Sequence, residues 1–428
     1  MLSGLLRRTW RRLPLSLARK RQIQAHLFHA LPWVFRRHDS YRVWRALYRA
    51  TDDANRTALS RQDQPPVPLL EATPLLSPPV RLIAFYLPQF HPIPENDLWW
   101  GRGFTEWFNV VRATPQFPGH YQPHLPGELG FYDLRLVEVQ ERQVHLAKLY
   151  GIYGFAFYFY WFAGKRLLER PIQQYLDNVQ LDLPFCLCWA NENWSRRWDG
   201  RESELLITQR YGSGDDKSFI AYVAKYLRDP RYIRIHGRPL LIVYRPDLLP
   251  NPRKTAQCWR NWCRDNGIGE LYLAYTQSFE ARNPSSYDFN AAIEFPPNNT
   301  SAPIINELID SLSPTFRGLV YDWTVFVTQS ETYRSPDYTL FRGINPSWDN
   351  EPRRRGGGAI YLGSSPTGYR KWLVNAIRDT LARFDAADER IVFVNAWNEW
   401  AEGAHLEPDQ KYGYAYLQAT RDALEETH

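Results

Sequence analysis

Two glutamates three residues apart, Glu399 and Glu402, are the side chains of this sequence best suited to do chemistry. They lie in the run 395–403, Asn-Ala-Trp-Asn-Glu-Trp-Ala-Glu-Gly, which follows a mostly apolar stretch, 390–394, typical of a buried β-strand. Sugar-cleaving enzymes use two carboxyl groups, one protonated near neutral pH and one ionised, and apolar neighbours raise the pKa of the protonated one. The tryptophans of the run supply such neighbours, so it predicts an acid/base pair at a strand end rather than two solvated glutamates.

Eight apolar runs follow residue 80, and each ends in polar or aromatic residues. They are too unbroken for half-exposed strands and therefore predict parallel strands buried on both faces. Eight such strands separated by helical segments favour an α/β fold, a (β/α)8 TIM barrel. A doubly wound open sheet is the alternative, but no Gly-x-Gly-x-x-Gly turn follows the first strand. The predicted strands are 82–88, 154–161, 185–189, 239–244, 271–276, 291–295, 343–346 and 391–396, and the predicted helices are 137–149, 172–179, 217–227, 254–266, 367–384 and 414–426.

The C-terminal ends of barrel strands are where catalytic groups lie. In this chain the predicted strand ends mix hydrogen-bonding side chains with aromatic rings, and the whole chain has 17 tryptophans. Aromatic faces stack on pyranose rings, so this combination predicts a sugar-binding crater. The candidate substrate-binding residues at the strand ends are Tyr86, Gln89, His91, Tyr158, Tyr160, Trp189, Asn191, Glu192, Trp194, Tyr244, Gln277, Glu294, Trp348, Asp349, Asn350, Trp397 and Asn398.

The positive charge of the chain is concentrated at its start. Residues 1–50 have twelve lysines and arginines and one acidic residue, a net charge of +11, whereas the whole chain has +6. We predict a basic amphipathic helical arm over 1–50, a proline-rich linker over 51–79 and the barrel over 80–428. The arm suits an anionic membrane surface, docking on a partner protein, or packing on the barrel. No motif supports nucleic-acid binding.

No apolar run is long enough for a signal peptide or a membrane span, and the four cysteines do not form a disulfide framework. We therefore expect a cytoplasmic protein with reduced thiols, with peripheral attachment to the inner membrane through the arm as one option. The histidines His91, His120, His124 and His405 are dispersed singly, without zinc-type spacing. We expect no metal and no cofactor, so a metal-dependent hydrolase is a disfavoured alternative.

Several motifs in the same order resemble those of WbsX-type proteins. These are bacterial proteins associated with O-antigen and other surface polysaccharides, often labelled glycosyltransferases, and similar to the endo-acting α-mannosidases of glycoside hydrolase family 99. The resemblance extends over about residues 81–425 and adds Trp100, Glu106 and Trp107 to the candidate substrate-binding residues. The matching motifs are 85–91, 99–107, 119–124, 189–194, 348–350 and 397–403.

The resemblance implies a retaining enzyme acting on a glycan such as an α-mannoside, and a polysaccharide-assembly protein as the partner for the arm. Glu399 would take a proton from the sugar 2-hydroxyl, which attacks the anomeric carbon to give a 1,2-anhydro sugar, and Glu402 would be the general acid/base. A direct nucleophile with a separate acid also fits two carboxylates. The acceptor, water or a sugar, stays open, and a non-catalytic carbohydrate-binding barrel is the alternative function.

Overall fold

The computed structural model describes residues 65–75, 77–196, 201–212 and 214–428. Its centre is a closed barrel of parallel strands in which β1 pairs with both β2 and β15, so the ring has no free edge. The predicted (β/α)8 barrel is therefore confirmed. In ring order the strands are β1 Arg81–Tyr86, β2 Ile152–Phe162, β4 Phe185–Trp189, β8 Arg238–Val243, β9 Tyr272–Thr276, β10 Ala291–Ile293, β12 Leu340–Ile344 and β15 Ile391–Val394.

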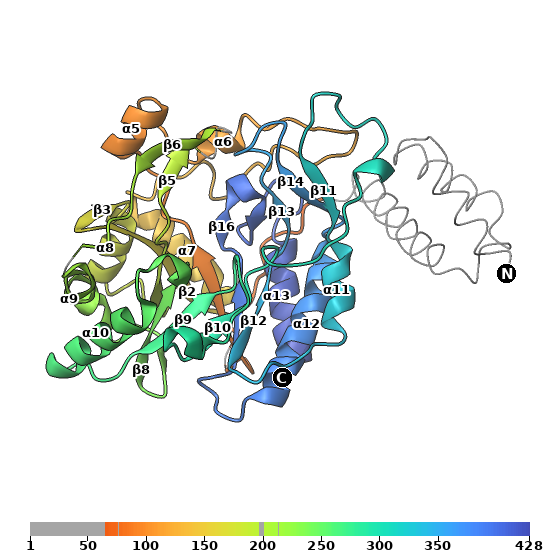
Figure 1. Ribbon diagram of the computed structural model, residues 1–428. Helices are drawn as coiled ribbons and strands as arrows, with labels where there is room; N and C mark the ends of the chain where they lie inside the picture. Colours follow the sequence, from red (N-terminus) through yellow and green to blue (C-terminus); the bar gives the residue numbers. More distant parts are fainter. Residues whose placement is uncertain (1–64, 76, 197–200, 213) are drawn as a thin grey trace, which may run out of the picture.

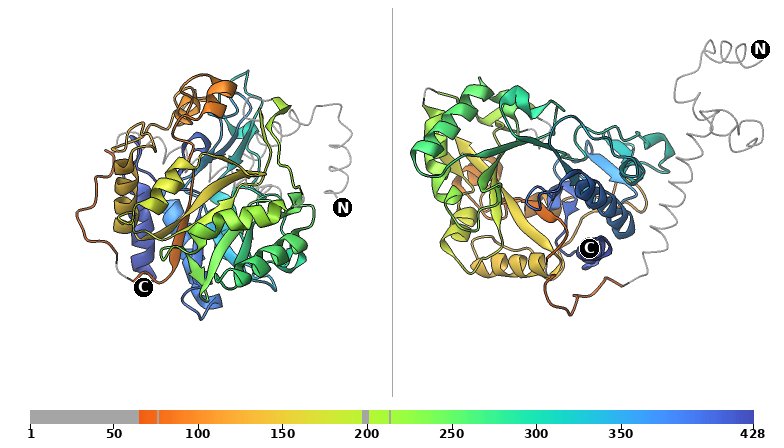
Figure 2. Two further views of the ribbon diagram at one scale, coloured as in Figure 1. Left: turned by 90° about the vertical axis from the view of Figure 1, so that its left-hand side faces the viewer. Right: turned by 90° about the horizontal axis from the view of Figure 1, so that it is seen from below.

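Helices cover the outside of the barrel, as the view from below shows (Figure 2). Two of them begin where the sequence has a capping residue followed by proline: the side chain of Asn251 accepts a hydrogen bond from the Lys254 amide, and Ser365 accepts one from Gly368. Only a short 3₁₀ turn, η3 Pro284–Tyr287, lies between β9 and β10. The outer helices are α7 Val137–Leu149, α8 Arg170–Asp177, α9 Asp215–Leu227, α10 Pro252–Asp265, α11 Thr324–Ser330, α12 Pro366–Arg383 and α13 Ala415–Glu426.

Smaller elements gather over the C-terminal ends of the strands, on the upper side of Figure 1. They include an antiparallel hairpin, a three-stranded sheet in the order β11-β14-β13, and a second hairpin directly after β15. Long insertions at this end of a barrel form the binding site in enzymes of this fold. These elements are α5 Pro94–Trp100, α6 Trp107–Val110, β5 Trp194–Arg196, β6 Arg201–Ile207, β11 Leu319–Asp322, β13 Trp348–Asp349, β14 Ala359–Leu362, β16 Asn398–Glu399, η5 Trp400–Glu402 and β17 Ala404–His405.

The described part of the predicted linker lies against the barrel. Val67 exchanges backbone hydrogen bonds with the segment before α13, donating to Tyr412 O at 3.2 Å and accepting from Tyr414 N at 3.0 Å. The backbone amide of Leu70 donates to the hydroxyl of Tyr150 at 3.0 Å. The chain therefore contacts the barrel well before residue 80. The predicted arm, 1–50, lies outside the described residues, and within the described ones no helix is long and apolar enough to cross a bilayer.

Candidate active site

The hairpin β16–β17 positions both candidate catalytic glutamates. Glu399 ends β16, and Glu402 ends the 3₁₀ turn η5 that connects the two strands. The next residue, Gly403, has a φ of +59°, and a Cβ at this position would lie 3.0 Å from the Asp349 Cβ. Glycine satisfies both the left-handed backbone and the close approach, so the tight turn brings Glu399 and Glu402 to the same side.

The hairpin is fastened to the end of β1. The side-chain Nδ2 of Asn398 donates to Leu87 O at 3.0 Å, and its side-chain Oδ1 accepts from Leu87 N at 2.7 Å. The ring of Trp400 stacks on His405 with 3.7 Å between centroids. Both interactions are buried, so the two glutamates extend from a rigid support rather than from a free loop.

One arginine, Arg353, joins three carboxyl groups. Its Nε donates to Glu106 at 2.7 Å, its Nη2 donates to Glu399 at 2.9 Å, and its Nη1 donates to Glu402. The Glu106 side chain is fully buried, whereas 21% of the Glu402 side chain is exposed. The two terminal nitrogens of a single planar guanidinium thus hold the glutamates of the Glu-x-x-Glu motif side by side.

The charges in this cluster do not balance if every carboxyl group is ionised. Burial raises the pKa of Glu399 and of Glu402, Arg353 opposes that shift, and neighbouring carboxylates add to it. Arg353 faces three carboxyl groups, and Arg354 adds a further positive charge only near Glu402, so the cluster favours retention of a proton near neutral pH. The arrangement therefore provides what acid/base chemistry needs, a carboxylate and a carboxylic acid next to each other.

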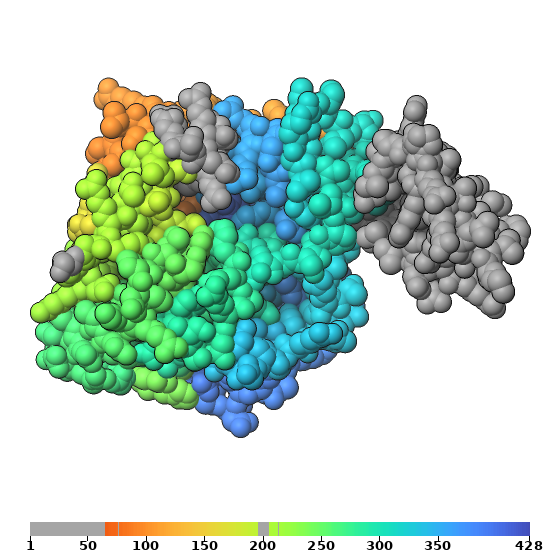
Figure 3. Space-filling view, in the orientation of Figure 1, coloured from red at the N-terminus to blue at the C-terminus, as the bar shows by residue number. Residues whose placement is uncertain are grey.

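A cavity of about 570 Å³ opens above the two glutamates. In the space-filling view the surface is hollowed between its yellow-green and blue parts (Figure 3). Aromatic rings form much of the wall: Trp194 packs edge-on against Tyr160, with 5.1 Å between ring centroids. Burial raises the pKa of Tyr158 and Tyr160, so both phenols stay protonated and can donate hydrogen bonds to a ligand. The predicted site residues that line the cavity are Trp100, Tyr158, Tyr160, Glu192, Trp194, Tyr244, Trp348, Asn350, Glu399 and Glu402.

The remaining predicted residues do not line the cavity. For two of them, the direction of side chains along a strand explains why. Successive side chains of a barrel strand point alternately inward and outward. Trp189 points outward, where its ring stacks on Phe219 at 4.4 Å, and Tyr86 points outward to donate to Gln143 at 2.7 Å. The assignment of these two to the crater is wrong, because it took strand-end residues without regard to this alternation.

Other predicted residues support the loops around the cavity. Asn191 bonds the Arg245 backbone through both of its polar atoms and so ties the end of β4 to that of β8. Asp349 accepts hydrogen bonds from the side chains of His120 and Gln122, at 2.6 and 2.7 Å. These carboxylate and amide groups are engaged by protein partners below the cavity wall. The remaining residues placed outside the cavity lining are Gln89, His91, Glu106, Trp107, Gln277, Glu294, Trp397 and Asn398.

Glu294 and Gln277 lie beside a different, smaller cavity of about 220 Å³ next to α11. Glu294 accepts from Arg342 at 2.6 Å, and Gln277 donates to Tyr338 at 3.0 Å. His91 is bonded to Pro88 O at 2.9 Å, and burial lowers its pKa to about 4. Through these contacts Glu294, Gln277 and His91 interact with residues other than Glu399 and Glu402.

The sequence interpretation missed two arginines of the site, whereas it placed a third, Arg245, at the end of the fourth predicted strand. Arg353 and Arg354 both line the cavity, and Arg353 contacts both candidate catalytic glutamates. On the opposite wall, Arg245 lies 3.9 Å above the ring of Phe279 and donates to Glu192 at 3.0 Å. The run Arg353-Arg354-Arg355, which begins three residues after the matching motif at 348–350, was the available signal.

Exchange of single tryptophans should separate the cavity wall from the core. Trp348→Ala is expected to weaken binding of an oligosaccharide fragment by about 10- to 30-fold, because its ring faces the cavity. Trp189→Ala is expected to destabilise the fold by about 3–5 kcal/mol with little change in affinity, because its ring is buried against α9. Calorimetry and a melting curve for each variant test this pair, and an unchanged affinity in Trp348→Ala would contradict it.

Glu407, a buried glutamate outside the cluster around Arg353, supports the hairpin β16–β17 through hydrogen bonds. It accepts hydrogen bonds from Trp400 at 2.7 Å, Tyr132 at 2.9 Å and Gln143 at 2.6 Å. Burial outweighs these three donors and raises its pKa to about 7. Because the pKa of Glu407 is higher in the folded than in the unfolded protein, its protonated form favours folding. This contribution is fully present below about pH 4.5 and is lost as the pH rises to about 7.

Glu407→Gln is therefore expected to flatten the pH dependence of stability. Between pH 4.5 and 7, the unfolding free energy of the wild type should fall by on the order of 3 kcal/mol more than that of the variant. Urea unfolding of both proteins at several pH values measures the difference. Parallel curves for the two proteins would show that Glu407 does not titrate in this range.

A closed parallel barrel with an aromatic-walled cavity and paired glutamates at the C-terminal ends of its strands is an arrangement typical of carbohydrate-active enzymes. The chain belongs to the WbsX glycosyltransferase family, whose sequence model matches residues 82–420. The motifs quoted above lie within this range, so the family resemblance is confirmed.

The chain is also similar to curated proteins and to solved structures. The chain is 51% identical over 426 residues to the uncharacterised protein WxcX of Xanthomonas campestris pv. campestris strain B100, and covers 60% of its length. It also resembles the structure of the GH99 endo-alpha-mannosidase from Bacteroides thetaiotaomicron, with a TM-score of 0.50 and 15% identity over 81% of this chain and 97% of that one. A glycoside hydrolase-like protein aligns with a TM-score of 0.51 and 16% identity over 86% and 99% of the two chains. At these identities the structural likeness shows the fold.

Proposed function

We propose that the protein cleaves or transfers a glycosidic bond of a surface polysaccharide, with retention of configuration, through Glu399 and Glu402. The observation that supports this most strongly is the pairing of these two carboxyl groups on Arg353 at the floor of the cavity. An α-mannoside-like linkage is proposed because a structural neighbour is an endo-alpha-mannosidase. Without a covalent or acid/base role, there is little reason to bury two carboxyl groups beneath a binding cavity.

The proposed first step uses both glutamates in opposite protonation states. The Glu399 carboxylate removes the proton of the sugar 2-hydroxyl, and that oxygen attacks the anomeric carbon. The bond to the leaving oxygen breaks while Glu402 donates its proton to that oxygen. The products are a 1,2-anhydro sugar, a protonated Glu399, an ionised Glu402 and a free glycan hydroxyl. Burial raises the pKa of Glu399 to about 8, and the positive charge of Arg353 opposes this shift, so Arg353 favours the ionised form that the base needs.

The second step restores both groups. The Glu402 carboxylate takes a proton from water or from an acceptor sugar, whose oxygen attacks the anomeric carbon. The bond from this carbon to the 2-oxygen breaks, and Glu399 returns the proton to that oxygen. Two displacements at one carbon give net retention. Partial exposure of the Glu402 side chain, 21%, is compatible with its contact with leaving group and acceptor.

A direct attack by Glu399 on the anomeric carbon is the competing retaining mechanism. The two mechanisms differ in their need for the 2-hydroxyl. In the direct mechanism, a 2-deoxy-2-fluoro glycoside with a good leaving group would leave a covalent sugar on Glu399. In the proposed mechanism the 2-hydroxyl is the nucleophile, and fluorine replaces it, so the protein would stay unlabelled. Mass spectrometry of the treated protein distinguishes these outcomes, and a labelled Glu399 would overturn the anhydro-sugar route.

Product analysis tests the function as a whole. The purified chain is incubated with α-mannan fragments and with surface polysaccharide from its source, in water enriched in ¹⁸O. Hydrolysis places ¹⁸O on the new reducing end, and transfer gives longer glycans without label. Binding without any bond cleavage, by wild type and Glu402→Gln alike, would favour the non-catalytic carbohydrate-binding barrel.

A further inference from the structure

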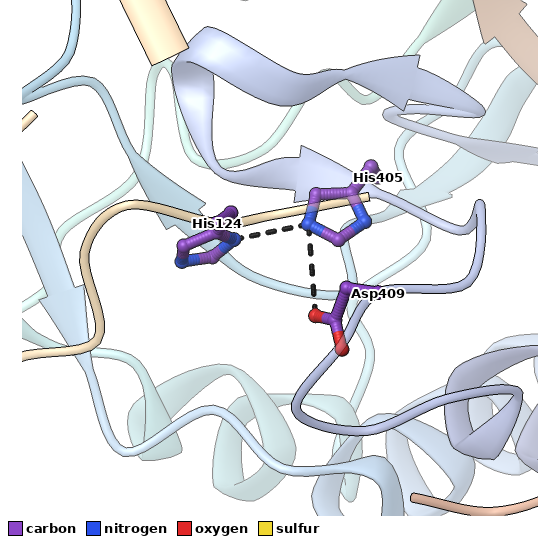
Figure 4. Close-up of side chains that lie close together, drawn as sticks. All are labelled: His124, His405 and Asp409. Carbon is purple, nitrogen blue, oxygen red and sulfur yellow. Dashed lines mark hydrogen bonds and ion pairs between the residues drawn. The ribbon is translucent and has the colours of Figure 1, made fainter. Parts of the chain in front are cut away.

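Three buried side chains from two distant segments meet on the β17 side of the catalytic hairpin (Figure 4). His124 Nδ1 lies 3.0 Å from His405 Nε2, and the latter lies 3.9 Å from Asp409 Oδ2. The three atoms all lie within 4.8 Å of one another. Within the described part of the chain, no other group of at least three histidine, cysteine or acidic side chains is arranged in this way.

The second polar atom of two of these side chains is already engaged. The Nδ1 of His405 is 3.0 Å from Glu407 O, and because a carbonyl only accepts, Nδ1 has the proton and Nε2 has a free lone pair. One carboxylate oxygen of Asp409, Oδ1, accepts from the Tyr412 amide, which leaves Oδ2 directed at His405. Metal-binding histidines commonly donate their other ring nitrogen to a backbone carbonyl in this manner.

We propose that His124 Nδ1, His405 Nε2 and Asp409 Oδ2 bind one Zn²⁺ ion. Ligand atoms of a tetrahedral zinc site lie about 3.3 Å apart, given Zn–N and Zn–O distances of about 2.0–2.1 Å. The observed separations lie on either side of this value, so a small inward shift of the Asp409 carboxylate completes the set. Two imidazoles and one carboxylate, with one position left open, also form the protein ligand set of known zinc sites. A fourth position remains for water.

The ion would serve as a brace between two loops. His124 belongs to the loop that contains His120 and Gln122, the two side chains that bind Asp349, whereas His405 stacks on Trp400 inside the catalytic hairpin. None of the three ligands lines the cavity above Glu399 and Glu402. The zinc site is therefore separate from the glycan chemistry. A cavity of about 480 Å³ lies beside the cluster and is lined by chain neighbours of the ligands, among them Tyr121, Gln122 and Gln410.

The expectation from the sequence was that no metal binds. His124 and His405 are 281 residues apart, so no spacing rule could associate them. Without an ion, the contact between the two rings is a hydrogen bond from His124 Nδ1–H to His405 Nε2. This metal-free arrangement is the alternative that an experiment must exclude.

Zinc titration of the full chain tests the proposal. The protein is dialysed against a chelator and then against buffer, Zn²⁺ is added, and bound metal is counted by mass spectrometry after removal of the excess. The wild type is expected to bind one equivalent at this site, with a higher melting temperature in Zn²⁺. Co²⁺ in the same site should give the visible absorption of a tetrahedral nitrogen–oxygen complex.

Three variants assign that equivalent to the cluster. His124→Ala and Asp409→Asn should each lose one bound Zn²⁺ and the zinc-dependent rise in melting temperature. His145→Ala, an exposed histidine on α7, should keep both. Histidines in residues 1–50 contribute equally to all of these proteins, so only the difference counts. If His124→Ala does not fold, Asp409→Asn and the Co²⁺ spectrum of the wild type decide. Absence of bound zinc in the wild type, or its full retention in a ligand variant, would overturn the site.

Discussion

Glu402→Gln is expected to lower turnover on a natural glycan by about 10²- to 10⁴-fold. Glutamine keeps the size of the side chain and can still accept from Arg353, but it has no proton to give to the leaving oxygen. Steady-state rates on an oligosaccharide with a poor leaving group measure the effect. An activated aryl glycoside should suffer less in the first step, because its leaving group needs no proton.

A second glutamate of the same cavity provides the control. Glu192 lines the cavity but is paired with Arg245 on the opposite wall, 3.0 Å away, and not with Arg353. Glu192→Gln should therefore change the Michaelis constant more than turnover. Near-normal turnover of Glu402→Gln on the natural glycan would remove this residue from the mechanism, whatever the result with the aryl glycoside.

Arg353→Met is expected to be the second most damaging change. It removes the positive charge that the buried Glu106 and Glu399 share with the partly exposed Glu402, and loss of one partner of a buried ion pair costs about 3–5 kcal/mol. Arg353 lowers the pKa of Glu399 and Glu402, so without it both carboxyl groups hold their protons to higher pH. The acidic limb of the pH profile of kcat/KM should move to higher pH, with a loss of about 10²-fold or more at neutral pH.

A matched exchange separates this effect from a general loss of charge. Arg354→Met removes the neighbouring arginine, which also lines the cavity, and should leave the acidic limb close to its wild-type position. Melting curves show whether Arg353→Met still folds at the assay temperature. An acidic limb at the same pH in the wild type and in folded Arg353→Met would show that Arg353 does not control the ionisation of Glu399 and Glu402.

The barrel itself could be predicted from local sequence. Strands such as 185–189 and 391–394 are continuous runs of apolar residues, a pattern that a strand buried on both faces requires. Helices α10 and α12 begin at Asn-Pro and Ser-Pro, where the capping chemistry is local. The three-stranded sheet over the cavity was not predicted, because its strands have only two to four residues and pair across long loops.

The site could be predicted in part, and the limit has two physical causes. The glutamates Glu399 and Glu402 could be proposed as a catalytic pair because they follow a recognisable strand. Trp189 was misplaced because the inward or outward direction of a strand residue depends on the register in the ring, which a single sequence does not reveal. Arg353 was missed because its partners lie 46 to 247 residues away in the chain.

Closure of the barrel has a consequence for how the protein is made. β1 is one of the first described elements to leave the ribosome, yet one of its two neighbours, β15, is among the last, and Asn398 bonds Leu87 across 311 residues. Such distant pairing is slow to form, since loop-closure entropy must be overcome first. Because the glutamate hairpin follows β15 directly, an unfinished chain lacks both the closing strand and the reactive groups. The nascent barrel is thus expected to stay open and inert until β15 and the hairpin β16–β17 have been synthesised.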